Sequence, residues 1–337
     1  MKAKIFSTVK YSLFLGLGIA LLFLAFKGVD LKKAFEEMKQ ADMFWVGLSL
    51  LCSVVAFVSR AFRWNILIEP LGYKPKLKNT TYAVLIGYLA NLALPRLGEV
   101  TRCGSLNKAE KVPFDALFGT VIVERVIDVI SLLICILLTA FFEYDRLGNF
   151  LYDNLFAPFK EKMQRLMYSP LFIAGVIVFI ILVVMFIRLI RKNSGKYGFI
   201  SKVVTTINGV VHGLKSIREI KRPWSFLFHS VFIWVLYFFS SYLCFFSLPA
   251  TSGLDWKAGL FVLSIGGMSM SAPVQGGIGV FHLLVSAGLL LYAIPHEHGI
   301  AFATLLHSTQ TILIILLGSI SFGILFFTNK KPSHDNA

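Results

Sequence analysis

Apolar stretches long enough to cross a lipid bilayer recur along this chain, and this feature limits the possible folds most strongly. A helix needs about 20 residues to cross roughly 30 Å of hydrocarbon. Of the 337 residues, 56% are hydrophobic and only 15% are charged, which leaves no room for a soluble domain of ordinary size. We therefore predict an all-α polytopic integral membrane protein forming a single domain over residues 1–337. The predicted full spans are about 9–27, 43–62, 114–142, 170–190, 224–248 and 300–327.

Two further apolar segments are interrupted. Residues 80–94 are short and stop at Pro95, and residues 258–294 are broken in the middle by SAPVQGGIGVF. Interrupted hydrophobic segments indicate re-entrant or discontinuous helices, which place free backbone groups inside protein or along a watery cavity. The sequence does not decide whether 258–294 is a re-entrant hairpin or two full spans. The residues that define the two breaks are Asn91, Pro95, Gly98, Pro273, Gly276, Gly277 and Gly279.

The net charge of +15 is distributed as expected for a bilayer protein. We interpret the N-terminal apolar stretch as an uncleaved first span, because no small-x-small cleavage site follows it. With that N-terminus in the cytoplasm, the cytoplasmic stretches hold 23 of the 33 Lys and Arg residues. This asymmetry predicts cytoplasmic termini, and it argues against nucleic acid as a partner.

The two breaks share the spacing Pro-x-x-Gly, at 95–98 and at 273–276. They lie in the first and last thirds of the chain and are entered from opposite faces in this topology. Such a pattern is typical of an inverted repeat, in which substrate binds where the broken elements meet. A chance match is also easy with so short a spacing, so the repeat is one of two open interpretations.

Charged residues inside apolar segments are the candidate functional groups. Arg60 and Arg63 share a helix face at the end of the second span, where they either snorkel to head groups or bind a lipid phosphate. Glu124, Arg125 and Asp128 fall near the middle of the 114–142 span, where ionisable groups must be paired or functional. We weigh two roles for these three residues: an internal ion pair that locks helices together, or a direct role in handling the substrate or protons.

The segment NLALPRLGEVTR, residues 91–102, adds a second set of charges beside the first break. Arg96 and Arg102 next to freed backbone amides would form an anion pocket, whereas Glu99 could simply pair with Arg102 or balance the arginines. His282 lies just beyond the second break, and a lone His in an apolar stretch is more often a packed residue than a functional one. His229, His307 and Gln310 have no partner that the sequence identifies.

Other chemistries leave no signal in the sequence. The four cysteines are scattered singly, without a CxxC or Cys/His cluster, so we expect no disulfide frame, metal site or cofactor. No nucleophile with a partner base and no Walker motif is present, so we expect neither an enzyme nor an ATPase.

Four motifs together resemble a known family, the lysylphosphatidylglycerol synthetase transmembrane region. The motifs are SRAFRW at 59–64, NLALPRLGEVTR at 91–102, ERVID at 124–128 and PVQGGIGVFH at 273–282. The family includes the flippase domain of the bacterial multiple peptide resistance factors, and the similarity covers about residues 10–327. The resemblance implies a multi-pass protein of the bacterial inner membrane that moves lipid, without the soluble synthetase part. In this sequence the Pro-to-Arg spacing is compressed near Arg96, and His282 stands where relatives commonly have Glu, which puts a lysyl-lipid substrate in doubt.

The leading hypothesis is a lipid flippase with membrane lipids as its partners: an anionic phospholipid, an aminoacylated phospholipid or a polyprenyl-phosphate-linked lipid. Arg60, Arg63, Arg96 and Arg102 would hold the phosphate, and Glu99, Glu124, Arg125 and Asp128 would balance charge and gate the path. The alternative is a non-transporting scaffold or regulator of a lipid-modifying enzyme, in which these charges are only locks. The sequence leaves open whether the chain forms a homo-oligomer.

Overall fold

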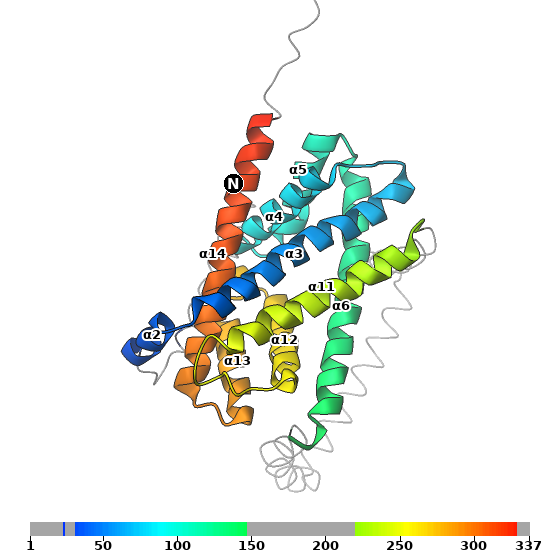
Figure 1. Ribbon diagram of the computed structural model, residues 1–337. Coiled ribbons are helices and arrows are strands. Elements are labelled where there is room, and N and C mark those ends of the chain that lie inside the picture. The colour runs from blue at the N-terminus through cyan, green and yellow to red at the C-terminus, as the bar shows by residue number, and fades with distance from the viewer. Residues whose placement is uncertain (1–22, 24–30, 147–219, 329–337) are drawn as a thin grey trace, which may run out of the picture. The chain divides into compact units, whose positions relative to one another are not determined.

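The computed structural model describes Phe23, residues 31–146 and residues 220–328, and every regular element in that part of the chain is helical (Figure 1). The predicted spans at 9–27 and 170–190 lie outside the described residues, apart from Phe23. The described helices belong to one compact unit, formed by Met1–Phe142 and Ser216–Ala337, and a second unit comprises Glu143–Lys215. The single membrane domain stays a prediction.

The helices of this unit follow the predicted segments closely. In chain order they are α2 (Leu31–Lys39), α3 (Met43–Ile68), α4 (Leu77–Ala93), α5 (Leu97–Glu110), α6 (Phe114–Phe142), α11 (Pro223–Phe245), α12 (Trp256–Ser271), α13 (Val280–Leu289) and α14 (His296–Thr328). Short 3-10 turns are η1 (Glu69–Leu71), η4 (Gln275–Gly277) and η5 (Leu290–Tyr292). The helices predicted at 43–62, 114–142, 224–248 and 300–327 are confirmed. Helices α3 and α14 are longer than predicted, α6 has the predicted bounds, and α11 ends earlier, at Phe245.

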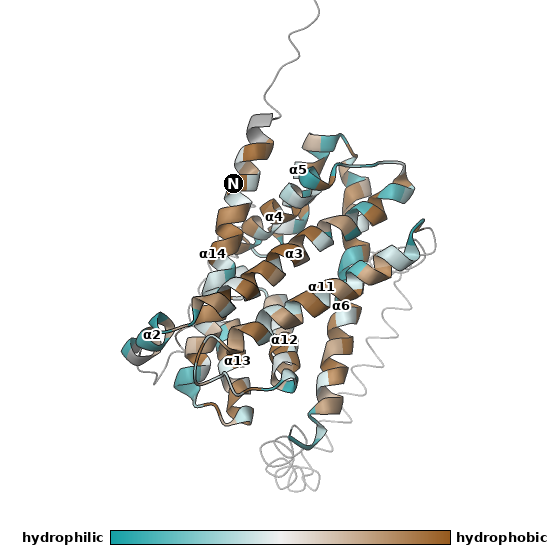
Figure 2. Ribbon diagram, viewed as in Figure 1, coloured by the Kyte–Doolittle hydropathy of each residue, from teal (hydrophilic) through white to brown (hydrophobic). Residues whose placement is uncertain are grey.

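Four of the described stretches are long and apolar enough to cross a membrane: Met43–Leu71, Pro223–Phe245, Gln275–Tyr292 and His296–Leu325. Figure 2 shows hydrophobic residues along most of α3, α11 and α14. The helix ends have the expected local chemistry. The Asp42 side chain accepts a hydrogen bond from the Phe44 amide at the start of α3, and the Asp255 side chain accepts one from the Ala258 amide at the start of α12.

Helices α3 and α11 form an antiparallel pair along their whole length (Figure 1). At one end, the Asp42 amide donates to the Ser247 carbonyl at 2.9 Å. At the other end, Arg222 donates to Glu69 at 2.7 Å. Polar side chains that share a face of α3 can therefore meet α11 at successive levels of the pair.

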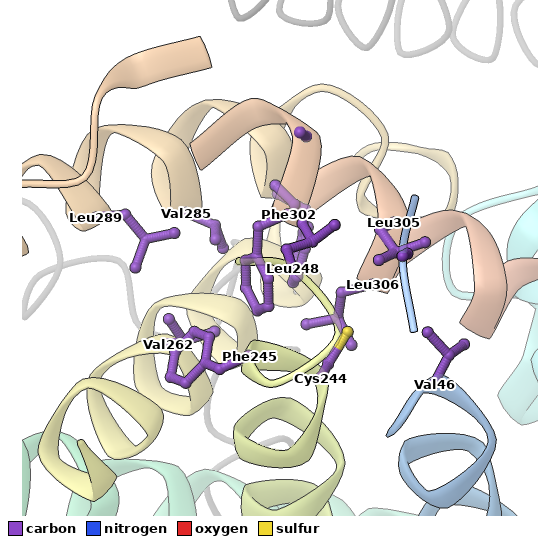
Figure 3. Close-up of a cluster of buried hydrophobic side chains, with 14 of the residues drawn as sticks. Val46, Cys244, Phe245, Leu248, Val262, Val285, Leu289, Phe302, Leu305 and Leu306 are labelled. Carbon is purple, nitrogen blue, oxygen red and sulfur yellow. The ribbon is translucent and has the colours of Figure 1, made fainter. Parts of the chain in front are cut away.

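The largest apolar core lies where α11, α12, α13 and α14 pack together, next to the start of α3 (Figure 3). The rings of Phe245 and Phe302 lie 4.8 Å apart between centroids, and both side chains are fully buried. Val262 and Leu289 complete this packing from α12 and α13 (Figure 3). The core fixes the helices that carry the second helix break.

Candidate functional site: a buried arginine and carboxylate cluster

The first helix break connects α4 to α5 and has a specific cap. Leu94 has an extended backbone, and Arg96 has a left-handed one with φ 63°. Arg96 occupies the N-cap position of α5 but makes no capping bond. The Asn91 side chain on α4 does this instead, because its Oδ1 accepts from the Gly98 amide at 2.7 Å. In the motif Asn-x-x-x-Pro-x-x-Gly, the Asn side chain at the end of α4 thus caps the first turn of α5, across the break.

Glycine is required at Gly98 because α4 and α5 cross in direct contact there. A Cβ on Gly98 would lie 2.6 Å from the Asn91 side-chain amide, and one on Gly87 would lie 2.9 Å from the Gly98 carbonyl oxygen. The close crossing brings the next turns of α5, with Glu99 and Arg102, against the other helices of the unit. Gly87 was not singled out from the sequence.

The second break, between α12 and α13, is built on three glycines with positive φ. Gly276, Gly277 and Gly279 have φ of 56°, 74° and 83°, which side chains rarely adopt. His307 of α14 holds this break, since its Nε2 lies 2.8 Å from the Gly276 carbonyl oxygen. A Cβ on Gly276 would lie 2.8 Å from Leu92 of α4, so the two breaks are in contact.

Arg60 and Arg63 of α3 both bind Glu124 of α6. Arg60 Nε lies 2.6 Å and Arg63 Nη2 lies 3.1 Å from Glu124 Oε1. The Arg63 and Glu124 side chains are fully buried, and that of Arg60 is 6% exposed. Both guanidinium groups are turned inward onto Glu124, which argues against simple snorkelling as the explanation of their position.

Asp128 and Arg102 complete the cluster. Asp128, one turn along α6 from Glu124, accepts from Arg63 Nη2 at 2.6 Å and also pairs with Arg60. Arg102 of α5 donates to the second oxygen of Glu124 at 2.6 Å and lies over the Trp64 ring. We call these five residues (Arg60, Arg63, Arg102, Glu124 and Asp128) the arginine cluster. It joins α3, α5 and α6.

The remaining predicted charges lie around the cluster. Arg125 pairs with Glu99 at 2.7 Å and is 43% exposed, so the anticipated local pairing of Glu99 with Arg102 is not what the structure has. Arg96 is exposed and makes no ion pair with any described residue. The structure therefore brings together three of the four predicted phosphate-binding arginines and leaves Arg96 at the break.

The cluster has more cationic than anionic groups. Among the described residues, three buried guanidinium groups meet two carboxylates. Three of their nitrogens, Nε and Nη1 of Arg63 and Nε of Arg102, are buried without a hydrogen-bond acceptor. A buried charge without a counter-charge costs several kcal/mol, and so do unsatisfied donors. Chemically, such a group is suited to bind an anion.

A line of polar contacts leads from the cluster along α3 and α11. Arg60 Nη1 donates to the Tyr237 hydroxyl at 3.4 Å, and this hydroxyl lies 3.3 Å from that of Tyr88. Ser53 lies two turns from Arg60 toward the N-terminus of α3. There, Gln310 of α14 donates to Ser53 at 2.8 Å and to Ser240 of α11 at 2.9 Å. Ser49 also bonds to Ser240. We call the group of Ser49, Ser53, Ser240 and Gln310 the serine and glutamine cluster.

Sequence reasoning missed most of this second cluster. Gln310 and His307 were noted only as residues without a partner, and single serines in apolar helices carry no distinctive signal. The spacing of Ser49, Ser53, Arg60 and Arg63 on one face of α3 was the one available clue. His282 is buried beside His307, with ring centroids 5.0 Å apart, and so belongs to the second break.

One protein family and two named proteins are similar in sequence to this chain. The family model described as lysylphosphatidylglycerol synthase TM region matches residues 11–318. A UPF0104 membrane protein of Methanocaldococcus jannaschii is 24% identical over 323 residues, covering 90% of this chain and 91% of that protein. The glycosyltransferase AglD of Haloferax volcanii is 27% identical over 105 residues, which are 31% of this chain and 17% of that protein. No solved structure matches the chain.

Proposed function

Because the chain belongs to the lysylphosphatidylglycerol synthase transmembrane-region family, we propose that this multi-pass membrane protein moves a lipid with an anionic phosphate head group across the bilayer. The supporting observation is the arginine cluster, which is buried and has one guanidinium more than its carboxylates can neutralise. Arginine suits this role because its planar group binds phosphate oxygens in a bidentate way. No catalytic step by this chain is part of the proposal.

In this proposal, Glu124 and Asp128 hold the arginines when no lipid is bound. A phosphate entering the cluster accepts from Arg63 Nη1 and Nε and from Arg102 Nε, the donors that have no acceptor in the described residues. The acyl chains stay in the surrounding lipid while the head group crosses, so their transfer has no hydrophobic cost. Arg96, exposed at the first break, makes the first contact with the entering phosphate.

The topology that accompanies this mechanism places the first break inside the membrane. Helix α4 has 17 residues, about 25 Å at 1.5 Å per residue, which is short for a full crossing. We therefore take α4 and α5 as a re-entrant hairpin from the cytoplasmic side, and the contact of Leu92 with Gly276 as the meeting of two broken elements of an inverted repeat. Both termini are then cytoplasmic, in the cytoplasmic membrane of a prokaryote.

The experiment uses the full chain in liposomes with tail-labelled anionic phospholipids. Wild type should accelerate transbilayer movement, and the Arg102→Ala/Glu124→Ala double variant, which removes one cation and one anion, should lose at least about 90% of that acceleration. Arg222→Ala is the matched control, because it removes an arginine whose ion pair with Glu69 is outside the cluster. Absence of acceleration by wild type would overturn the proposal.

The alternative function is a non-transporting scaffold, and the five ion pairs within the cluster favour it. Arg102→Lys separates the two functions, because lysine keeps a cation beside Glu124 but lacks the guanidinium fork. In a pure lock, this variant should keep both folding and phenotype. In a substrate site it should keep folding only, because the Nε donor that faces the phosphate is lost.

A further inference from the structure

The charge balance of the arginine cluster limits the anion that it can take. Arg60, Arg63 and Arg102 contribute three positive charges, and Glu124 and Asp128 contribute two negative ones. Arg125 pairs with Glu99, and its Nη1 lies 4.0 Å from Asp128 Oδ2, so this neighbouring pair adds one charge of each sign and leaves the balance unchanged. One further negative charge would neutralise the buried group. A phosphodiester supplies one charge, whereas a phosphomonoester carries roughly −1.5 to −2 at neutral pH and would leave excess negative charge in a buried place.

The residues next to the cluster limit what can be attached to that phosphate. Arg60 and Ser53 are seven residues apart on the same face of α3, a rise of roughly 10 Å. Between those levels lie the Tyr88 and Tyr237 hydroxyls, followed by the serine and glutamine cluster. These groups are hydroxyl, amide and carbonyl groups, which pair well with hydroxyl groups of a ligand.

Among the residues that the structure describes, the helices around this second cluster offer no free counter-charge for a cation. Helices α3 and α11 have no Asp or Glu, and α14 has only Glu297, in its first turn. Glu124 and Asp128 are already bound by arginines. The oxygen Oε1 of Gln310 makes no hydrogen bond with a described residue and is a neutral acceptor. An ammonium group placed there would be desolvated without a counter-charge, which costs several kcal/mol.

We infer that the transported lipid is a phosphodiester whose head group is uncharged and bears hydroxyl groups, with the arginine cluster binding the phosphate and the serine and glutamine cluster binding the head group. This inference rests on the proposed function and selects among its candidates. It disfavours aminoacylated phospholipids, which carry an ammonium group, and single polyprenyl phosphates, which are phosphomonoesters. The head group displaces the Gln310 hydrogen bonds to Ser53 and Ser240 as it passes.

The test compares four tail-labelled lipids in liposomes with the full chain. Phosphatidylglycerol is a phosphodiester with a hydroxylated head, and phosphatidylmethanol is a phosphodiester without hydroxyl groups. Lysyl-phosphatidylglycerol adds ammonium groups, and phosphatidic acid is a phosphomonoester. We expect phosphatidylglycerol to move about tenfold faster than lysyl-phosphatidylglycerol and phosphatidic acid, which corresponds to about 1.4 kcal/mol, and a few-fold faster than phosphatidylmethanol.

Variants of the serine and glutamine cluster make the test specific. Gln310→Ala should abolish the preference for phosphatidylglycerol over phosphatidylmethanol, and Gln310→Glu should reduce the discrimination against lysyl-phosphatidylglycerol by about tenfold or more. Ser264→Ala is the matched control, since it removes a buried hydroxyl contact between α6 and α12, with Thr139 at 2.8 Å, away from the two clusters. It should leave head-group preference unchanged.

The outcomes separate this inference from the proposed function. Movement of all four lipids at equal rates, or faster movement of lysyl-phosphatidylglycerol, would overturn the inference and leave the proposed function standing. Movement of none of them by wild type would overturn both. If a Gln310 variant fails to fold, as judged by its melting in detergent, the preference of the wild type among the four lipids still tests the inference.

Discussion

Two buried regions of this unit are stabilised in opposite ways. The core around Phe245 and Phe302 is apolar, and its only requirements are shape and volume. The arginine cluster is also buried, except for Asp128, which is 15% exposed, but it consists of charged groups, each of which depends on its partners. Hydrophobic residues of similar volume would often stabilise a fold as well as a buried ion pair, or better. The difference fits the proposed role of the cluster in binding an anion, and it predicts that the two regions respond differently to substitution.

The largest effect on stability should come from removing one charge of the cluster. Glu124→Gln leaves three buried guanidinium groups with one carboxylate, and it should destabilise the protein by about 3 to 5 kcal/mol. Thermal unfolding of purified protein in detergent measures this. Glu69→Gln is the matched control, because Glu69 pairs with a half-exposed Arg222 and its loss should cost about 1 kcal/mol or less. Equal losses of stability for the two variants would show that a buried carboxylate of the cluster contributes no more to stability than one in a partly exposed ion pair.

A truncation in the apolar core should cost less and should not affect transport by the folded fraction. Phe302→Ala removes a ring that contacts Phe245 and leaves a cavity, for an expected loss of about 3 kcal/mol, the low end of the range for this change in a buried core. Surrounding lipid provides little hydrophobic drive between helices, so the lost packing dominates. Melting in detergent and transport per folded molecule measure the two effects. A transport loss beyond the loss of folded protein would connect this core to the lipid path.

The cap across the first break should have a smaller effect. Asn91→Ala removes the acceptor for the Gly98 amide and should destabilise the protein by about 1 kcal/mol. Asn91→Asp keeps an acceptor and should retain most of that stability. Melting of the two variants gives the comparison, and equal destabilisation by both would show that Asn91 acts through something other than this hydrogen bond.

The smallest expected change in stability is a gain. Arg96 has a positive φ, and Arg96→Gly should stabilise the protein by roughly 0.5 kcal/mol, because the relief of that strain is partly offset by the greater freedom of glycine in the unfolded chain. Lys111→Gly is the control, because Lys111 has a φ of 60° at the end of α5. The two variants should melt alike, and Arg96→Gly alone should slow transport if Arg96 makes the first contact with the phosphate. Unchanged transport in both would remove Arg96 from the mechanism.

Much of the fold follows from the sequence because apolar length and Pro/Gly interruptions act locally. The helices at 43–62 and 114–142 and the break at Pro95 required no knowledge of neighbours. The partners of buried charges depend on how helices pack, and the sequence offered several combinations. The sequence identified Arg60, Arg63, Arg102 and Glu124 as candidate site residues, but it did not show that all three arginines bind the same carboxylate.

The serine and glutamine cluster could not be predicted for a different reason. Its members come from α3, α11 and α14, and Ser53 and Gln310 are 257 residues apart in the chain. Small polar residues are also common between membrane helices, where they let backbones approach, so their presence alone indicates nothing specific. The antiparallel pairing of α3 with α11 places these side chains next to the arginines along the same face of α3.

The most direct test of the central claim is a structure of the full chain in lipid nanodiscs that contain phosphatidylglycerol. The account predicts phosphate density within hydrogen-bonding distance of Arg63 Nη1 and Arg102 Nε, with the glycerol head group directed along α3 toward Ser53 and Gln310. Lipid density only at the outer surface of the helices, with the arginine cluster closed on Glu124 and Asp128, would contradict it.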